Sequence, residues 1–144
     1  MARSEAMDQL SRLVGDWDLT LTNAWFLDSL GVEQHGRATF QWLGDAFVIM
    51  DSELDGEPVW DLVFGHNTAY ERYEVLYHDS RGVDRHFVMS FTDTEWTMLR
   101  EDPDFHQRFV ARLEDDRILG AWEMSEDRGA TWRTDFDLRF ERRT

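Results

Sequence analysis

His66 is the side chain in this sequence that is best suited to proton transfer near neutral pH. It ends the run WDLVFGH, and it has the same parity as Trp60, Leu62 and Phe64. Because side chains alternate between the two faces of a strand, this parity points His66 toward an apolar interior, near a rim. An imidazole there could act as a general base or as the hydrogen-bond partner of a ligand. A structural histidine at a strand end is the other interpretation of the same pattern.

Arg85 and Arg100 lie at positions whose strand face is otherwise apolar. Arg85 has the parity of Phe87 and Met89, and Arg100 has the parity of Met98. An isolated charge in an apolar interior is very costly, so each guanidinium needs a partner. That partner could be the carboxylate, phosphate or enolate of a ligand, bound through the planar guanidinium. It could equally be an internal Asp or Glu, or both arginines could lie in water at a rim.

Tyr73 and Tyr77 share a face with Phe87 and could present hydroxyl groups inside an apolar pocket. The sequence has no motif typical of metal binding, of nucleophilic catalysis or of phosphate binding. No two histidines have metal-ligand spacing, there is no cysteine, and no serine stands in a Gly-x-Ser-x-Gly setting. No glycine-rich phosphate loop follows a strand into a helix. We therefore expect no metal site and no nucleophilic triad.

Period-two alternation dominates the part of the chain that must position these side chains. A short amphipathic helix is predicted over residues 4–14, where apolar side chains recur at helical spacing and Ser4 is available as the N-cap. Turn sequences such as Asp55-Gly56 separate several of the strand-like runs that follow. These runs are residues 15–26, 36–43, 45–54, 59–66, 70–78, 83–91, 94–101, 105–114, 117–125 and 130–141.

The short connections between these runs decide the fold class. They cannot hold crossover helices, so neighbouring strands must be antiparallel. An open sheet would leave two exposed edges and an uncovered apolar face, and closure into a barrel removes both. We predict an all-β protein, a closed antiparallel up-and-down barrel of about ten strands in one domain over residues 1–144. A barrel of roughly eight strands is just filled by its own side chains, so a wider one has room for a ligand.

The turn sequences also predict strand registers. The DSRG turn places Tyr77 opposite Val83 and, on the outer face, Glu74 opposite His86. Both tyrosines then point toward the same aromatic interior. The pairs expected in the next hairpin, around a turn at residues 93–94, are Phe91 with Trp96 and Met89 with Met98.

The last strand shows the clearest alternation of the chain. In ATWRTDFDLRFER, the side chains of Trp132, Thr134 and Phe136 alternate with charged residues that include Asp135. Strict period two predicts that the first three point inward and that Asp135 points to solvent.

Composition limits the partners. The chain has 30 acidic and 15 basic residues, a net charge of −15, so phosphate backbones and anionic membranes are repelled. No apolar run approaches the roughly 20 residues needed to span a bilayer. The N-terminal MARSEAMDQL lacks the apolar stretch of a signal peptide, so we expect a cytoplasmic protein. Aromatic residues make up 14% of the chain, enough to fill a core or to line a pocket.

Two signatures resemble known barrels. LVGDWDLTL, a Gly-x-Trp on the first strand after a short helix, resembles the start of calycins, the superfamily of lipocalins, fatty-acid-binding proteins and nitrobindins. The longer patterns RATFQWLGDAFVIM, WDLVFGHNTAYERYEVLYHDSRG and GAWEMSEDRGATWRTDFDLRFERR resemble the calycin-like family catalogued as domain of unknown function 1579. The similarity runs from about Leu13 to Arg142, and it implies a small-ligand barrel without an agreed activity.

The resemblance also carries expectations for single residues. It implies that Trp17 is a structural plug at the closed base of the barrel. Nitrobindin-like barrels bind haem through a histidine close to the C-terminus, whereas the last histidine here is His106, so haem is disfavoured and no cofactor is expected. Fatty-acid-binding proteins hold a carboxylate with Arg-x-Tyr on the final strand, and this chain has Arg139-Phe140-Glu141 instead. A direct fatty-acid carrier is therefore disfavoured.

We predict that the barrel binds a small, largely apolar and aromatic or anionic molecule. The alternative is a cavity enzyme of the isomerase or cyclase type, in which His66 or a tyrosine transfers a proton. A third interpretation is an interaction module whose exterior carries the function. The sequence leaves all three open, and it is compatible with a homodimer. The predicted ligand-binding residues are Trp42, Trp60, His66, Tyr73, Tyr77, Arg85, Phe87, Met89, Trp96, Met98, Arg100, Trp122 and Phe136.

Overall fold

The computed structural model describes residues 3–27 and 31–144, and within them it contains ten antiparallel strands. The strands are β1 (Gly15–Thr22), β2 (Gln34–Leu43), β3 (Phe47–Leu54), β4 (Glu57–Asn67), β5 (Arg72–Asp79), β6 (Asp84–Phe91), β7 (Glu95–Glu101), β8 (His106–Leu113), β9 (Arg117–Ser125) and β10 (Arg133–Arg142).

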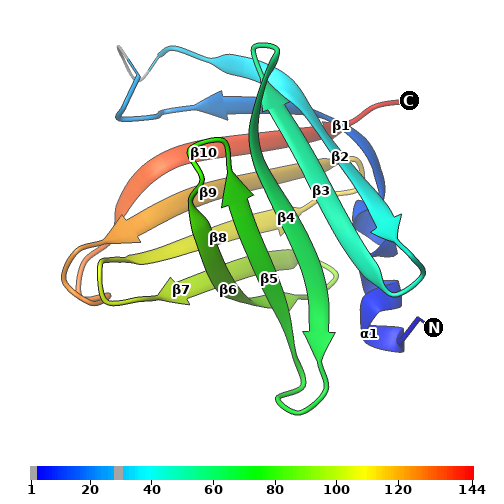
Figure 1. The fold of residues 1–144 in the computed structure, drawn as a ribbon. Coiled ribbons are helices and arrows are strands. Elements are labelled where there is room, and N and C mark those ends of the chain that lie inside the picture. Colours follow the sequence, from blue (N-terminus) through cyan, green and yellow to red (C-terminus); the bar gives the residue numbers. More distant parts are fainter. Residues whose placement is uncertain (1–2, 28–30) are drawn as a thin grey trace.

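These strands close into a barrel in the order β1-β10-β9-β8-β7-β6-β5-β4-β3-β2 (Figure 1). Each strand pairs with its neighbours in sequence, and β1 pairs with both β2 and β10. The predicted closed up-and-down barrel is confirmed. Closure satisfies the backbone groups that an open sheet would expose at its edges.

The N-terminal helix has two parts. Helix α1 (Glu5–Asp8) is α-helical and continues as the 3₁₀-helix η1 (Gln9–Leu13). The Ser4 hydroxyl accepts a hydrogen bond from the backbone N–H of Met7, as expected of an N-cap. In the described part of the chain, no helix has the length and apolar character to cross a bilayer.

The half of the barrel interior next to this helix is filled by aromatic rings, and we call it the packed half. Phe40 contacts three other rings, with centroid distances of 6.1 Å to Phe64, 6.2 Å to Trp96 and 6.2 Å to Phe140. Trp17 is 1% exposed and packs edge-on against Phe140 at 6.5 Å. The packed half is therefore a solid core at the helix end.

Trp17 has the structural role that the calycin resemblance implies. Its indole N–H donates a hydrogen bond to the Leu13 carbonyl at 2.8 Å, which joins β1 to the helix. The Arg142 guanidinium lies 4.2 Å from its ring centroid and donates to the Val14 carbonyl at 3.1 Å. This base links the first strand, the last strand and the helix.

The β5–β6 hairpin differs from its predicted register by two residues. Tyr77 faces Arg85 instead of Val83, and His86 faces Leu76 instead of Glu74. The turn is longer than expected because the Asp79 carboxylate accepts hydrogen bonds from the backbone of the turn itself. A shift of two keeps every side chain on its predicted face. In the next hairpin, Phe91 with Trp96 and Met89 with Met98 are confirmed.

A β-bulge breaks the alternation of the last strand. On β10, Thr134 faces Glu123 and Phe136 faces Trp122, so Asp135 is an extra residue. The prediction that Thr134 and Trp132 point inward is wrong: Thr134 is exposed, and Trp132 packs under the Arg108 guanidinium, 4.0 Å from its ring centroid. Asp135 lines the interior instead.

Candidate functional site

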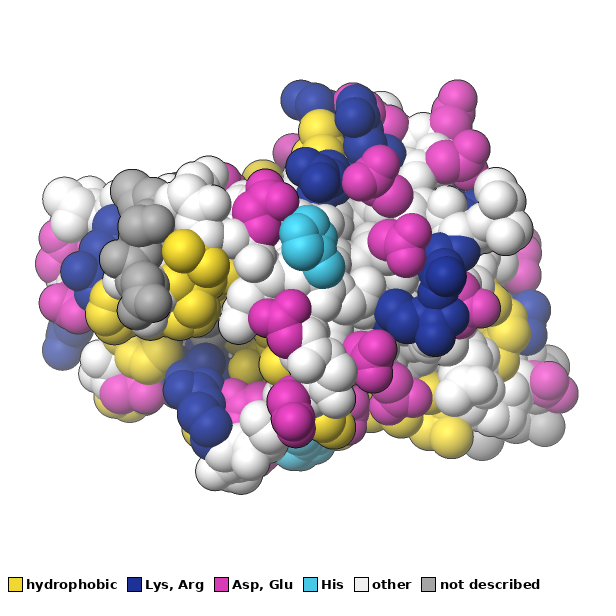
Figure 2. Space-filling view, turned by 90° about the horizontal axis from the view of Figure 1, so that it is seen from above, with side chains coloured by type: hydrophobic (Ala, Val, Ile, Leu, Met, Phe, Trp, Pro, Cys, Tyr) yellow, Lys and Arg dark blue, Asp and Glu magenta, His cyan; other side chains and the backbone are white. Residues whose placement is uncertain are grey.

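The end of the barrel away from the helix contains a cavity of about 640 Å³, and we call this part the open half. Seen from above, the surface has a hollow bordered by hydrophobic and charged side chains (Figure 2). Aromatic side chains supply most of the apolar wall of the cavity: Trp25, Phe26, Trp60, Tyr77, Phe105, Trp122 and Phe136. Its polar lining consists of Gln34, Asp79, Ser80, Arg81, Arg85, Gln107 and Asp135.

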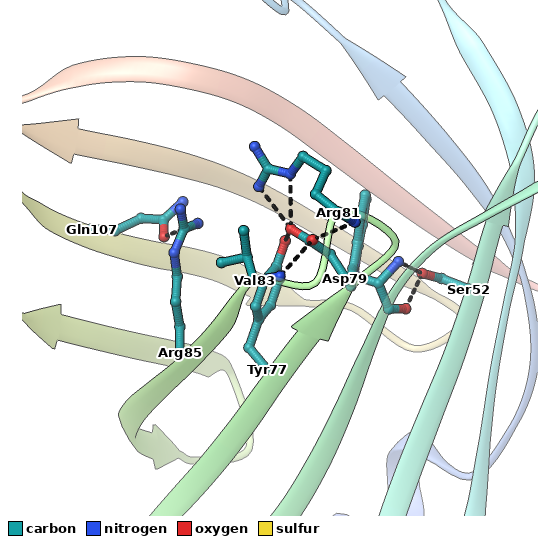
Figure 3. A network of polar contacts seen from close by, with 8 residues as sticks. Ser52, Tyr77, Asp79, Arg81, Val83, Arg85 and Gln107 are labelled. Atoms are coloured by element: carbon teal, nitrogen blue, oxygen red, sulfur yellow. Dashed lines mark hydrogen bonds and ion pairs between the residues drawn. The ribbon is translucent and has the colours of Figure 1, made fainter.

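A second bulge brings Val59 to the cavity beside Trp60, which ordinary alternation already points inward. The β3–β4 register shifts between Asp51 and Glu53, so that Ser52 faces two residues of β4. The Ser52 hydroxyl donates to the Trp60 carbonyl at 2.5 Å and accepts from its backbone N–H at 3.3 Å (Figure 3). As a result, Val59 and Trp60 both line the cavity although they are adjacent in sequence.

Asp79 organises one wall of the cavity. Its carboxylate accepts hydrogen bonds from the Tyr77 hydroxyl at 2.9 Å and the Arg81 guanidinium at 2.6 Å, as well as from the backbone N–H groups of Arg81 and Val83 (Figure 3). Burial alone would raise the pKa of Asp79, but these hydrogen bonds lower it to about 2. Burial and the nearby Asp79 raise the pKa of Tyr77. Asp79 is therefore an ionised carboxylate, held in place by hydrogen-bond donors of the protein itself.

Among the described residues, Arg85 is the cationic side chain of the cavity that has no ion-pair partner. Its guanidinium donates to the Gln107 side-chain oxygen at 3.2 Å (Figure 3). It also lies 5.1 Å from the centroid of the Phe105 ring and 5.7 Å from that of the Tyr77 ring. Within residues 3–27 and 31–144, no carboxylate oxygen lies within 4.0 Å of it. A half-buried guanidinium that contacts an amide and two aromatic rings attracts an anion.

The sequence left open whether Arg100 pairs with a ligand, with an acid of the protein or with water. In the structure it pairs with two acids of the protein. It is 8% exposed, and its side-chain nitrogens lie 2.9 Å from a carboxylate oxygen of Asp102 and 2.9 Å from one of Asp104. It also donates to the Phe105 carbonyl at 3.0 Å. Arg100 therefore fixes the β7–β8 turn, and its charge is already compensated.

Asp135 is the acidic side chain that the β10 bulge turns into the cavity. Its Oδ1 atom accepts a hydrogen bond from the Trp25 indole N–H at 2.6 Å. Burial raises the pKa of Asp135, although this hydrogen bond and the positive charges of Arg133, Arg85 and Arg81 act in the opposite direction. Strict alternation assigns Asp135 to the outer face, so its place in the cavity could not be predicted from the strand pattern.

Three predicted site residues lie at the helix end of the barrel instead of in the cavity. The Tyr73 hydroxyl donates to the Ala6 carbonyl at 2.5 Å, and the His66 ring lies 5.1 Å from the Tyr73 ring. The Arg3 guanidinium lies 3.4 Å from the centroid of Trp42. These contacts attach the helix to the barrel.

The other predicted residues divide between wall and core. Trp60, Tyr77, Arg85, Trp122 and Phe136 line the cavity. Four more are buried and lie outside its lining: Phe87, Met89, Trp96 and Met98. Phe87 supports the wall from behind, with its ring 5.3 Å from Trp122 and 6.1 Å from Tyr77.

The loop after β1 supplies wall residues that the alternation could not identify. We expected the first strand to reach residue 26, but β1 ends at Thr22, and Asn23 has a positive φ of 54°. Trp25 and Phe26 therefore leave the sheet and reach the mouth of the cavity, where the Phe26 ring lies 5.8 Å from Phe136. Over the described residues, no group of three or more His, Asp or Glu side chains is arranged to hold a metal ion.

Comparisons with known proteins identify the fold. No protein-family model matches the chain, and no curated protein matches it in sequence. The crystal structure of Rv2717c from M. tuberculosis is similar, with a TM-score of 0.70 and 14% identity over 99% of both chains. A de novo designed fluorescence-activating β-barrel has a TM-score of 0.48 and 14% identity over 94% of this chain and 98% of the design, too distant to carry an argument. The chain thus has a calycin-like ten-stranded barrel, and the likeness extends to the fold alone.

Proposed function

We propose that this protein binds a small, largely apolar or aromatic molecule in the open half of the barrel, and that Arg85 binds an anionic or acceptor group of that molecule. The observation that carries this proposal is the difference between three arginines of this end. Arg81 pairs with Asp79, and Arg100 lies against Asp102 and Asp104. The guanidinium of Arg85, by contrast, contacts an amide and aromatic rings.

The walls of the cavity support the apolar part of the proposed ligand. Trp60, Trp122 and Phe136 are close to one another, with ring centroids 6.1 Å apart for Trp60 and Phe136 and 6.4 Å for Trp122 and Phe136. A flat molecule that displaces water from such rings gains roughly 25 cal/mol for each Å² of apolar surface that it buries. Orientation would then come from the few polar groups of the lining.

Catalysis by His66 or a tyrosine has less support from the geometry. His66 lies beside Tyr73 at the helix end, away from the cavity lining. Of the two predicted tyrosines, Tyr77 lines the cavity, but its hydroxyl donates to Asp79. We therefore place the ligand-binding hypothesis ahead of an isomerase or cyclase.

Two experiments test the proposal. Native mass spectrometry of freshly purified protein should show a small molecule that remains bound. For the role of Arg85, calorimetric titration with naphthoate, an aromatic carboxylate, should show binding that Arg85→Gln weakens about tenfold or more, because a hydrogen bond to a charged group contributes roughly 1.5–3 kcal/mol.

Arg108→Gln is the matched control. Arg108 is next to Gln107 in sequence but points outward, where it pairs with Glu123 at 2.9 Å. The Arg108→Gln variant should leave the affinity for naphthoate unchanged. An apo mass, together with no change of melting temperature across a panel of aromatic and aliphatic anions, would refute the proposal.

Two further assignments are proposals that rest on the sequence. Membership of the family catalogued as domain of unknown function 1579 is supported by the patterns quoted above, and the three-dimensional similarity adds only the calycin-like fold. A cytoplasmic location is the second proposal, and a sequence without cysteine is compatible with a reducing compartment.

A further inference from the structure

Arg85 and Asp135 line the same cavity from nearly opposite walls. Arg85 is on β6 and Asp135 on β10, and these strands are four places apart in a closed ring of ten. Both side chains belong to the cavity lining, yet no ion pair within 4.0 Å joins them in the described structure. The cavity therefore presents a cationic group on one side and an acidic group on the other.

The carboxyl group of Asp135 has one oxygen in use. Oδ1 accepts the hydrogen bond from Trp25 at 2.6 Å, whereas Oδ2 has no hydrogen-bond donor among residues 3–27 and 31–144. The neighbouring Asp137 also has one oxygen in use, since its Oδ2 accepts from the Asn23 side chain at 2.6 Å, but Asp137 is not part of the cavity lining. A carboxyl oxygen that faces an aromatic cavity is most stable when a donor reaches it.

Asp79, the other acid of the lining, cannot take this role in the same way. It already accepts hydrogen bonds from Tyr77, Arg81 and two backbone N–H groups. Of the two acids in this lining, Asp135 is therefore the one with a carboxyl oxygen that no donor among the described residues reaches, and it lies on the wall that faces Arg85.

We infer that the ligand carries a hydrogen-bond donor, such as a hydroxyl or amino group, at the end opposite its anionic group, and that Asp135 accepts this hydrogen bond. The inference rests on the proposed function, because it assigns the anionic end to Arg85. It narrows the ligand class from apolar anions to flat molecules with an acceptor at one end and a donor at the other. Discrimination would follow because a ligand without the donor leaves Asp135 unpaired.

Three probes of nearly equal size test this assignment by calorimetric titration. They are naphthoate, a hydroxynaphthoate whose hydroxyl is on the far ring, and the methyl ether of that hydroxynaphthoate. The hydroxyl should tighten binding about tenfold relative to naphthoate, and the methyl ether should lose this advantage because it has no donor. Asp135→Ala should abolish the tenfold difference, and Asp135→Asn should reduce it.

Asp137→Asn is the matched control. Asp137 is on the same strand and also holds the loop after β1, through Asn23, but it is not part of the cavity lining. The hydroxyl advantage should survive in this variant, which separates recognition by Asp135 from loosening of the loop.

The outcomes distinguish the two proposals. If naphthoate binds in an Arg85-dependent way but the hydroxyl adds nothing, or its advantage survives in Asp135→Ala, the role of Asp135 is refuted and the proposed function stands. If none of the three probes binds the wild-type protein, both are refuted. Circular dichroism of each variant checks that the barrel is intact.

Discussion

The packed half and the open half of this barrel are both rich in aromatic residues, but their rings meet different neighbours. In the packed half, Phe40 and Trp17 are each 1% exposed and pack against other rings. In the open half, Trp25 is 57% exposed, and its indole N–H donates to Asp135. Aromatic content alone therefore does not distinguish a core from a binding wall.

What separates the two halves is the placement of charge. Arg85 and Asp135 are in the lining of the open half, and charged groups lose much of their solvation if apolar groups close over them. The interior of the packed half is formed by aromatic rings and aliphatic side chains such as Leu19 and Met50, which can approach one another to contact. We conclude that the polar lining prevents the side chains of the open half from filling its interior.

The largest expected effect compares aromatic truncation in the two halves. Phe40→Ala should lower the free energy of unfolding by about 3–5 kcal/mol, because it leaves a cavity among three rings. Trp25→Ala should cost about 1 kcal/mol or less, because this side chain is largely exposed. Urea denaturation of both variants measures the difference. Equal losses would contradict the division into two halves.

A smaller effect should depend on pH. Asp79 has a pKa of about 2, below the ordinary 3.8, so its contribution to stability is present above pH 3.8 and is lost as the pH falls toward 2. At neutral pH, Asp79→Asn should lower the free energy of unfolding by about 1–2 kcal/mol, with the lower figure if solvent screens its exposed partner Arg81. The difference from wild type should shrink across this pH window in denaturant titrations.

Asp61→Asn provides a control of opposite sign for that experiment. Burial and the facing carboxylate of Asp51 raise the pKa of Asp61, so its ionised form destabilises the folded state. This variant should be as stable as wild type or more so at neutral pH. If Asp61→Asn lost as much stability as Asp79→Asn, the titration of Asp79 would not be the cause of the loss in Asp79→Asn.

The smallest effect concerns the two tyrosines that the sequence could not separate. Tyr73→Phe removes the hydrogen bond to Ala6 that attaches the helix, and it should cost about 1 kcal/mol while leaving naphthoate affinity unchanged. Tyr77→Phe should change the affinity as well, because Tyr77 lines the cavity. Denaturation and calorimetry on the same two samples would reveal whether either tyrosine acts in both halves.

The inward positions of most strands could be predicted because alternation is a local property. Trp60, Tyr77, Arg85, Trp122 and Phe136 line the cavity as expected. Their height along the barrel could not be predicted, because it depends on which end the helix covers. His66, Tyr73 and Trp42 have the expected parity but lie at the covered end.

The missed site residues share a different cause. Asp135 is inside because a bulge on β10 inserts one residue against β9, and Trp25 reaches the mouth because β1 ends four residues early. A bulge is decided by pairing across strands, so the sequence of one strand does not reveal it. Arg100 is neutralised by Asp102 and Asp104 of the turn that directly follows it. Gln107, the partner of Arg85, comes instead from another strand, which no local pattern identifies.

The sequence by itself determined an all-β chain of short antiparallel strands, its closure into a barrel, and an aromatic interior, because strand periodicity and turn chemistry act over a few residues. Only the tertiary structure decided which half of that interior is solid, which acid faces the cavity, and which arginine lacks a carboxylate partner among the described residues. These properties come from contacts between segments far apart in the chain, where register, bulges and charge pairing are set together.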